Sequence, residues 1–157
     1  MLAMAHAAPV RAAPAAELDW GTFKQRFVAD GSRVVDTGNK GVSHSEGQGW
    51  GMLFAEAAGD RPAFEALWNW TRTSLRRPDG LFSWRWEPNA AKHVGDPNDA
   101  ADGDLLIAWA LARAARRWHD SQWAAQSGFV ASAVLTHLTA EIAGKMILLP
   151  GIAGFRD

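Results

Sequence analysis

The stretch VSHSEGQGWGMLFA, residues 42–55, decides how this sequence folds. The stretch resembles the start of a helix. Gly47, Gly49 and Gly51 nevertheless stand at every second position in it. Each glycine inside a helix costs up to about 1 kcal/mol relative to alanine, so the first turns carry a weakness that needs a cause. Because glycine has no side chain, it lets another backbone or a ligand come close. We expect these glycines to make room for a ligand beside Glu46.

A capping role would also account for Glu46 at this helix start. Ser43 and Glu46 have the spacing of a capping box, in which both side chains satisfy free N–H groups of the first turn. The three glycines contribute nothing to such a box, so their presence favours a site. A nucleotide-binding G-x-G-x-x-G loop does not fit, because Met52 stands where the third glycine should be and no convincing strand precedes the motif.

A second candidate site lies in GDPNDAADGDLLIAWALARAARRW, residues 95–118, where several aspartates precede an apolar helix. One or two acids would suffice to cap the helix that follows and to interact with its dipole. A calcium loop that starts at the first aspartate fails, because Ala101 occupies its sixth position and Ile107 its twelfth. The role that remains is that of a carboxylate acting on a substrate. The crowded acids are Asp96, Asp99, Asp102 and Asp104.

Both acidic segments open helices with apolar bodies. If the two helices point the same way, Glu46 and the aspartate cluster lie on one rim. A pair of carboxylates across a cleft is the equipment of glycoside hydrolysis. One carboxyl must stay protonated to act as an acid, and the nearby rings of Trp50 and Trp84 would favour that form.

The composition narrows the alternatives. The chain has 157 residues and a net charge of −1, which fits one domain without the basic surplus of a nucleic-acid surface. Cysteine is absent, which excludes disulfides, a cysteine-rich zinc site and a cysteine nucleophile. Nine tryptophans and no tyrosine exceed the needs of a core of this size, and flat rings also stack on sugar faces. Nothing in the sequence is long enough to span a membrane.

The pattern of caps, breakers and apolar spacing predicts an all-α protein of about five helices joined by long loops, without βαβ alternation. Residues 1–16, rich in alanine and proline, read either as the remnant of a secretory signal or as a disordered leader, and residues 17–157 as the domain. A candidate strand lies in LFSWRW, residues 81–86. The helices are expected from Asp19 to about Ala29, from residues 43–45 to Ala58, from Asp60 to the turn at 76–80, from residues 99–104 to Trp118, and over 121–143.

SEGQGWGM, GLFSWRW and DAADGDLLIAWALARAARRW together resemble glycoside hydrolase family 8 over about residues 18–157. The likeness is greatest to the family's periplasmic endoglucanases of bacterial cellulose-synthesis operons. It implies an (α/α)6 barrel of twelve helices, which needs well over about 200 residues. Five helices fit here, so the resemblance implies the N-terminal half of such a barrel, incomplete in this chain.

The resemblance also implies an activity and its residues. The family contains inverting endo-β-1,4-glucanases that hydrolyse cellulose-like glucan, and Glu46 matches its general acid. Asp102 matches the acid placed at the central sugar, and Trp84 a ring that stacks on glucose. The departures are mild: Trp50 stands where tyrosine is commoner, and Ala101 where serine or threonine is usual. The remaining residues expected to bind substrate are Trp50, Ser45, Gln48 and Asp104.

In the family, the carboxylate that activates water lies in the second half. Asp120, Glu141 and Asp157 are the acids that follow the cluster, and none has a motif-like setting. We therefore expect the water-activating base to be missing from this chain, which would leave it inactive alone, and a non-catalytic glucan-binding or scaffold fragment is the alternative. A plain helical interaction protein ranks below both, because it leaves the glycines and the acid cluster without a cause.

The resemblance implies neither a metal nor an organic cofactor. The expected partner is a β-1,4-glucan chain, with no nucleic acid and no membrane span, and with association with a cellulose-synthesis complex as a further expectation. The expected location is periplasmic or secreted.

Overall fold

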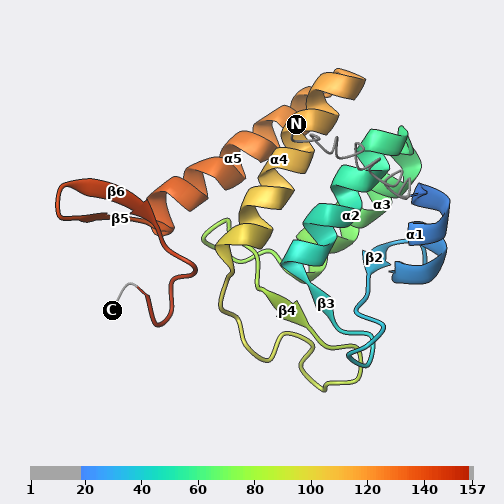
Figure 1. Cartoon of the computed structure of the whole chain (residues 1–157), viewed down its shortest axis with the longest axis horizontal. Helices are drawn as coiled ribbons and strands as arrows, with labels where there is room; N and C mark the ends of the chain where they lie inside the picture. The colour runs from blue at the N-terminus through green and yellow to red at the C-terminus, as the bar shows by residue number, and fades with distance from the viewer. Residues whose placement is uncertain (1–18, 156–157) are drawn as a thin grey trace, which may run out of the picture.

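The computed structural model describes residues 19–155, and the predicted leader at residues 1–16 lies outside them. This part is mostly helical, as predicted, with three small two-stranded sheets (Figure 1). None of the helices in this part of the chain is long and apolar enough to cross a membrane. The helices are α1 (Trp20–Phe27), α2 (Ser45–Ala58), α3 (Arg61–Ser74), α4 (Ala101–Trp118) and α5 (Ser121–His137).

Three aspartates start helices by accepting hydrogen bonds from first-turn N–H groups, which is the usual role of an N-cap. Asp19 accepts from the N–H of Gly21, and Asp60 accepts from that of Ala63 with Pro62 in the first turn of α3. Asp120 accepts from two N–H groups at the start of α5. The caps predicted at Asp19 and Asp60 are confirmed.

The strands pair antiparallel in three separate ribbons. β1 (Val28–Ala29) pairs with β2 (Arg33–Val34), and β5 (Thr139–Ile142) pairs with β6 (Lys145–Leu148). β3 (Ser43–His44) pairs with β4 (Arg85–Trp86), so the residues just before α2 are bound to a segment about 40 residues further along the chain. Of the strand expected over residues 81–86, only this last piece is extended in a ladder.

The fifth helix ends earlier than predicted. It stops at His137, and residues 139–148 form a hairpin in place of the expected continuation to 143. Ala143 and Gly144 both have positive φ, which is what a two-residue hairpin turn requires. Leu138 is buried at the helix end, but Ile142 is 56% exposed on the hairpin. Their four-residue spacing therefore matched a helix by coincidence.

The core lies where α2, α3, α4 and α5 meet. Phe64 and Leu67 of α3, Ile107 and Leu111 of α4 and Val130 of α5 are fully buried in one cluster. A smaller cluster joins the start of α4 to the end of α5. Figure 1 shows α2 and α4 side by side, with α1 beyond α2 and α5 beyond α4.

α2 and α4 run parallel and approach closely through glycines. Ser45 meets Gly103, Gly49 meets Leu106, and farther along both helices Arg113 Nε donates to Glu56 at 2.7 Å. A Cβ atom on Gly49 would lie 2.5 Å from the Cβ of Leu106 and 3.2 Å from the backbone nitrogen of Ile107. The order of these contacts fixes the same direction for both helices, so both begin at the same end of the molecule.

The glycines of α2 mainly serve packing, which corrects the expectation that all of them clear room for a ligand. Gly49 accommodates α4, and a Cβ on Gly51 would collide with the side chain of Val34. Gly47 alone of the three lines a cavity together with Glu46. The glycines weaken α2, and this loss of helix propensity is offset mostly by the close contacts of Gly49 with α4 and of Gly51 with Val34.

Replacing Gly49 with alanine should lower the free energy of unfolding by about 1–3 kcal/mol, the usual cost of overpacking a filled core. The backbone of α4 cannot retreat as a flexible side chain could. Urea unfolding followed by circular dichroism measures the change. Gly128→Ala is the matched control: it is also helical, but nothing lies within 4 Å of its Cβ position. That variant should gain up to about 1 kcal/mol from helix propensity. Equal effects in both variants would contradict the packing role.

Candidate active site

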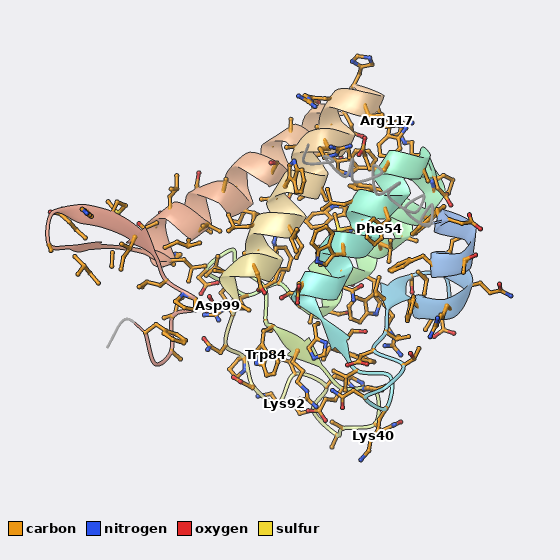
Figure 2. The ribbon with its side chains drawn as sticks, viewed as in Figure 1. Lys40, Phe54, Trp84, Lys92, Asp99 and Arg117 are labelled. Atoms are coloured by element: carbon orange, nitrogen blue, oxygen red, sulfur yellow. The ribbon has the colours of Figure 1, made fainter. Side chains whose placement is uncertain are left out.

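The first turns of α2 and α4 form one rim at the end of the molecule where both helices begin. Glu46 lies in the first turn of α2 and Asp102 in the first turn of α4, and both side chains are exposed. Figure 2 shows Trp84 and Asp99 at this end and Arg117 at the other. The expectation of acids on one shared rim therefore holds for Glu46 and Asp102.

Glu46 is not part of a capping box. The N-cap of α2 is His44, which makes no side-chain capping bond. Ser43 instead lies in β3, where its hydroxyl donates to the carbonyl of Val34 at 2.6 Å and accepts from Arg33 at 2.8 Å. The Glu46 carboxylate accepts a long hydrogen bond from the indole N–H of Trp50, at 3.4 Å. Because it is exposed and takes no part in capping, the carboxylate is available to a ligand.

A cavity of about 260 Å³ opens beside Glu46. It also brings in Asp36, a second carboxylate on the loop before β3, whose Oδ1 accepts from the N–H of Gly38 at 3.0 Å. The sequence alone gives Asp36 no role, because it lies ten residues before Glu46 in a glycine-rich loop and no local pattern connects them. The lining residues are Val34, Val35, Asp36, His44, Glu46, Gly47 and Trp50.

Trp50 separates this cavity from an apolar groove. The groove has a volume of about 390 Å³ and lies between α1 and α2. The Trp50 ring is 41% exposed and stacks on Phe54 with ring centroids 5.8 Å apart. The large flat ring of Trp50 is thus exposed next to Glu46, which is compatible with its predicted role in binding a sugar. The groove is lined by Phe23, Phe27, Val34, Gly47, Trp50 and Phe54.

Trp84 is held in one orientation by contacts on several sides. Its indole N–H donates to Asp96 Oδ2 at 2.8 Å, and its ring stacks on His44 with centroids 5.7 Å apart. Its carbonyl accepts from the N–H of Ser45 at 3.0 Å. The ring is therefore fastened directly to the start of the helix that carries Glu46.

Asp96 supports this ring as a carboxylate. The backbone N–H of Asn98 and then the indole of Trp84 lower its pKa below the ordinary value. In the sequence, Asp96 stands out only as one of the acids at the start of the fourth helix. Its partner is twelve residues away, so no helical spacing could reveal the pair.

Three of the residues expected to bind substrate lie beneath the rim. Gln48 is fully buried, where its amide accepts from the N–H of Val34 at 3.0 Å and donates to the carbonyl of the same residue at 2.8 Å. Ser45 is buried against Gly103. Asp104 is fully buried, with Oδ1 accepting from the N–H of Phe82 at 2.8 Å. The three side chains thus lie beneath the rim and are not among the residues that line its cavity, and their role in substrate binding stays a prediction.

The four aspartates at the start of α4 have four different environments, and of these side chains Asp102 Oδ1 accepts from a first-turn N–H, that of Gly103, at 2.7 Å. The N-cap is Ala100, without a side-chain bond. Asp99 is buried and pairs with Arg77 at 3.0 Å, while Asp102 is exposed on the rim. Burial raises the pKa of Asp104 to about 8, against the opposing effect of its bond from Phe82. None of the four aspartates therefore holds the N-cap position, although Asp102 satisfies one N–H of the first turn.

The later acids lie elsewhere. Asp120 caps α5, next to the end of α4 that is remote from the rim, and Glu141 lies in the β5–β6 hairpin. Asp157 lies outside the described residues. Within residues 19–155, no group of three or more histidine, aspartate and glutamate side chains is placed to hold a metal ion.

Comparison with known proteins identifies a family. The sequence model described as "Glycosyl hydrolases family 8" matches residues 1–157. An endoglucanase from Cellulomonas uda is 45% identical over 141 residues, which cover 89% of this chain and 39% of that protein. A probable endoglucanase from Novacetimonas hansenii is 44% identical over 137 residues, covering 87% of this chain and 40% of that protein.

Solved structures agree with this match. Endoglucanase Cel10, a family 8 glycosyl hydrolase from Klebsiella pneumoniae, superposes with a TM-score of 0.84 at 46% identity, covering 86% of this chain and 44% of that one. An endo-β-1,4-glucanase from an Achatina fulica gut metagenomic library gives the same score, covering 90% and 46%. The expected fold, part of an (α/α)6 barrel, is confirmed. The chain spans about 40% of the length of the curated relatives that it matches.

The buried carboxyl of Asp104 should make stability depend on pH. Its pKa is raised from 3.8 to about 8 in the folded protein, so between these values the folded state holds a proton that the unfolded state has lost. Stability from this group is fully present below about pH 4 and is lost as the pH rises towards 8, by up to about 1.4 kcal/mol per pH unit. Urea unfolding at pH 5, 6, 7 and 8 should show this slope in the wild type.

Asp104→Asn should remove that slope, because the amide carries no titrating proton and its oxygen can still accept from Phe82. The variant should therefore gain stability relative to the wild type as the pH rises. Asp102→Asn is the matched control, since it leaves Asp104 intact and should retain the slope. A wild type and an Asp104→Asn variant with parallel pH profiles would show that Asp104 ionises normally.

Asp96→Ala should loosen the Trp84 ring, because the indole N–H loses its acceptor. In a ¹H–¹⁵N spectrum, one of the nine indole signals should shift and exchange with solvent faster. Asp96→Asn, which keeps an acceptor oxygen, should restore most of the protection. Lys92→Ala, an exposed residue on the same connection between β4 and α4, is the control for general loosening. Unchanged indole exchange in Asp96→Ala would rule out the anchoring role.

Proposed function

Because this chain belongs to family 8 of the glycosyl hydrolases, we propose that it serves the inverting hydrolysis of a cellulose-like β-1,4-glucan, with Glu46 as general acid. The observation that carries this proposal is the parallel packing of α2 and α4, which places Glu46 and Asp102 on one rim. The endoglucanase names of the relatives support the substrate class.

Glu46 has the position that a general acid needs. Its carboxyl is exposed at the edge of a cavity and is not used in capping. In the proposed reaction, it donates a proton to the leaving glycosidic oxygen while a water molecule attacks the anomeric carbon from the opposite face of the sugar. The base that activates this water would lie about 6.5–9.5 Å from the acid.

The aromatic rings around the rim supply sugar-binding surfaces. Trp50 is exposed next to Glu46, and Trp84 is half-buried and fixed by Asp96 and His44. We assign Trp84 to stacking on a glucose unit and Asp102 to the central sugar. The apolar groove beyond Trp50 would extend the contact with the glucan chain.

The water-activating base is not among the acids that follow Asp102, in our proposal. Of these, Asp104 is buried, and Asp120 and Glu141 lie away from the rim. Asp36 is the other described carboxylate that lines the cavity of Glu46. A non-catalytic glucan-binding or scaffold fragment is the second candidate, because Trp84 and the cavity at Glu46 are present while we assign no water-activating base among the described acids after Asp102.

Export to the periplasm or outside the cell, and association with a cellulose-synthesis complex, are further proposals. They rest on the likeness of residues 18–157 to periplasmic members of the family. A β-1,4-glucan is the partner that the rim chemistry supports directly.

The first test is the release of reducing ends from a soluble β-1,4-glucan by the purified 157-residue chain. Any hydrolysis should fall by about 10²–10⁴-fold in Glu46→Gln, because the amide keeps the shape but cannot donate the proton. Glu65→Gln, an exposed glutamate on α3, is the matched control and should retain the wild-type rate. Activity that survives in Glu46→Gln would refute the assignment of the acid.

Binding separates the two candidate functions. Titration of a cello-oligosaccharide into the wild type and Trp84→Ala reports whether the rim holds glucan. A folded chain that binds but does not hydrolyse, with weaker binding in Trp84→Ala, would favour the glucan-binding fragment. Hydrolysis that is lost in Asp36→Asn as well as in Glu46→Gln would point to Asp36 as the second carboxylate. A folded chain that neither binds nor hydrolyses would contradict both candidates.

A further inference from the structure

A second cavity lies between α3 and the first turns of α5 and shares no residue with the cavity at Glu46. Its volume is about 420 Å³. Arginines and side-chain amides dominate its polar lining, and none of these residues has a part in the proposed hydrolysis. The lining residues are Glu65, Trp68, Asn69, Arg72, Arg76, Asp120, Gln122, Trp123 and Gln126.

Arg76 is a cation enclosed by aromatic rings. Its guanidinium carbon lies 5.2 Å from the ring centroid of Phe129, 5.5 Å from that of Phe82 and 5.6 Å from that of Trp68. Its Nε and Nη2 atoms are buried without a hydrogen-bond partner. Ring faces offset part of the cost of removing a cation from water, but they do not replace an acceptor for its N–H groups.

Arg72, in the last turn of α3, brings a second positive charge to the same cavity, whereas Arg76 follows the end of that helix. Its Nε donates to Asn69 Oδ1 at 3.0 Å, which fixes the start of its guanidinium group. Burial, and then the charge of Arg72, lower the pKa of Arg76. Within residues 19–155, neither arginine forms an ion pair. Two repelling cations at one cavity are the setting in which an anion is stabilised.

The two carboxylates of the cavity share one cation, Arg61, so these three groups together keep one negative charge. Glu65 pairs with Arg61 at 2.8 Å, and Asp120 pairs with the same arginine at 3.4 Å while it caps α5. With the charges of Arg72 and Arg76 added, the group has a net charge of +1, and these two arginines are the cations of the cavity without a carboxylate partner. Gln126 Oε1 is also buried without a partner, and because this oxygen is an acceptor, its free capacity suits water and not an anion.

We propose that this cavity is a binding site for a small oxyanion, a phosphate, sulfate or carboxylate group held between the guanidinium groups of Arg72 and Arg76. The planar fork of each guanidinium group matches two oxygens of such an anion. Gln126 lies in the same lining and can donate to a third oxygen. The proposal is independent of the hydrolytic function, because no residue of the rim takes part.

The test is calorimetric titration of the 157-residue chain with inorganic phosphate, sulfate and acetate, each at constant ionic strength maintained with sodium chloride. Saturable binding of one anion per chain is expected for at least one of the three. Phosphate or sulfate binding would identify a tetrahedral ligand, and acetate binding a carboxylate. Arg72→Gln should weaken the binding by about 10-fold or more, the loss expected when a charge-assisted hydrogen bond is removed.

Two further variants make the outcome unambiguous. Arg72→Lys keeps the charge but loses the fork, so its affinity should fall between those of the wild type and Arg72→Gln. Arg26→Gln removes an exposed arginine of α1, outside this cavity, and should bind as the wild type does. Arg72 is exposed, so its variants should fold, which unfolding curves would verify. The absence of saturable binding in the folded wild type, or equal affinity in Arg72→Gln, would overturn the proposal and leave the cavity to water.

Discussion

The close parallel contact between α2 and α4 is the constraint on which the rest of the structure depends. At Gly49 and Gly103, a single added methyl group would collide with the facing helix, so the two helices fit in one relative position. That fit brings both N-termini to the same end and thereby sets Glu46 and Asp102 on the same rim. The placement of the two acids is therefore a consequence of helix packing. It depends on Gly49 and Gly103, which are buried between the helices.

Buried polar side chains beneath the rim also hold its two helices in place, in addition to the glycine contacts. The side-chain amide of Gln48 satisfies both backbone groups of Val34, and Asp104 accepts the backbone N–H of Phe82. Buried polar groups are stable only with such partners. Each of these bonds joins a helix of the rim to a connecting segment, so motif residues without access to solvent are nonetheless part of the site.

Much of the fold could be predicted from local signals, and most of what failed depends on distant partners. Helix starts at Asp19 and Asp60 follow from caps that act within one turn. The shared rim could be predicted from two similar acidic helix starts, on the assumption that the two helices point the same way. The packing role of Gly51 depends on Val34, and the role of Asp96 on Trp84, neither of which any helical or strand period connects. The hairpin after α5 was missed because two positive φ angles overrode an apolar spacing that also fits a helix.

The pairing of β3 with β4 gives the segment from Ser43 to Trp86 an additional property. Its two ends are joined by a ladder and by the bond from the N–H of Ser45 to the carbonyl of Trp84. α2 and α3 thus lie inside a closed loop of chain, which is the form of a unit that opens as a whole. Local unfolding that frees β4 would release the Trp84 ring and the start of α2 in one event. A change that breaks this ladder would therefore disturb the ring and the acid together.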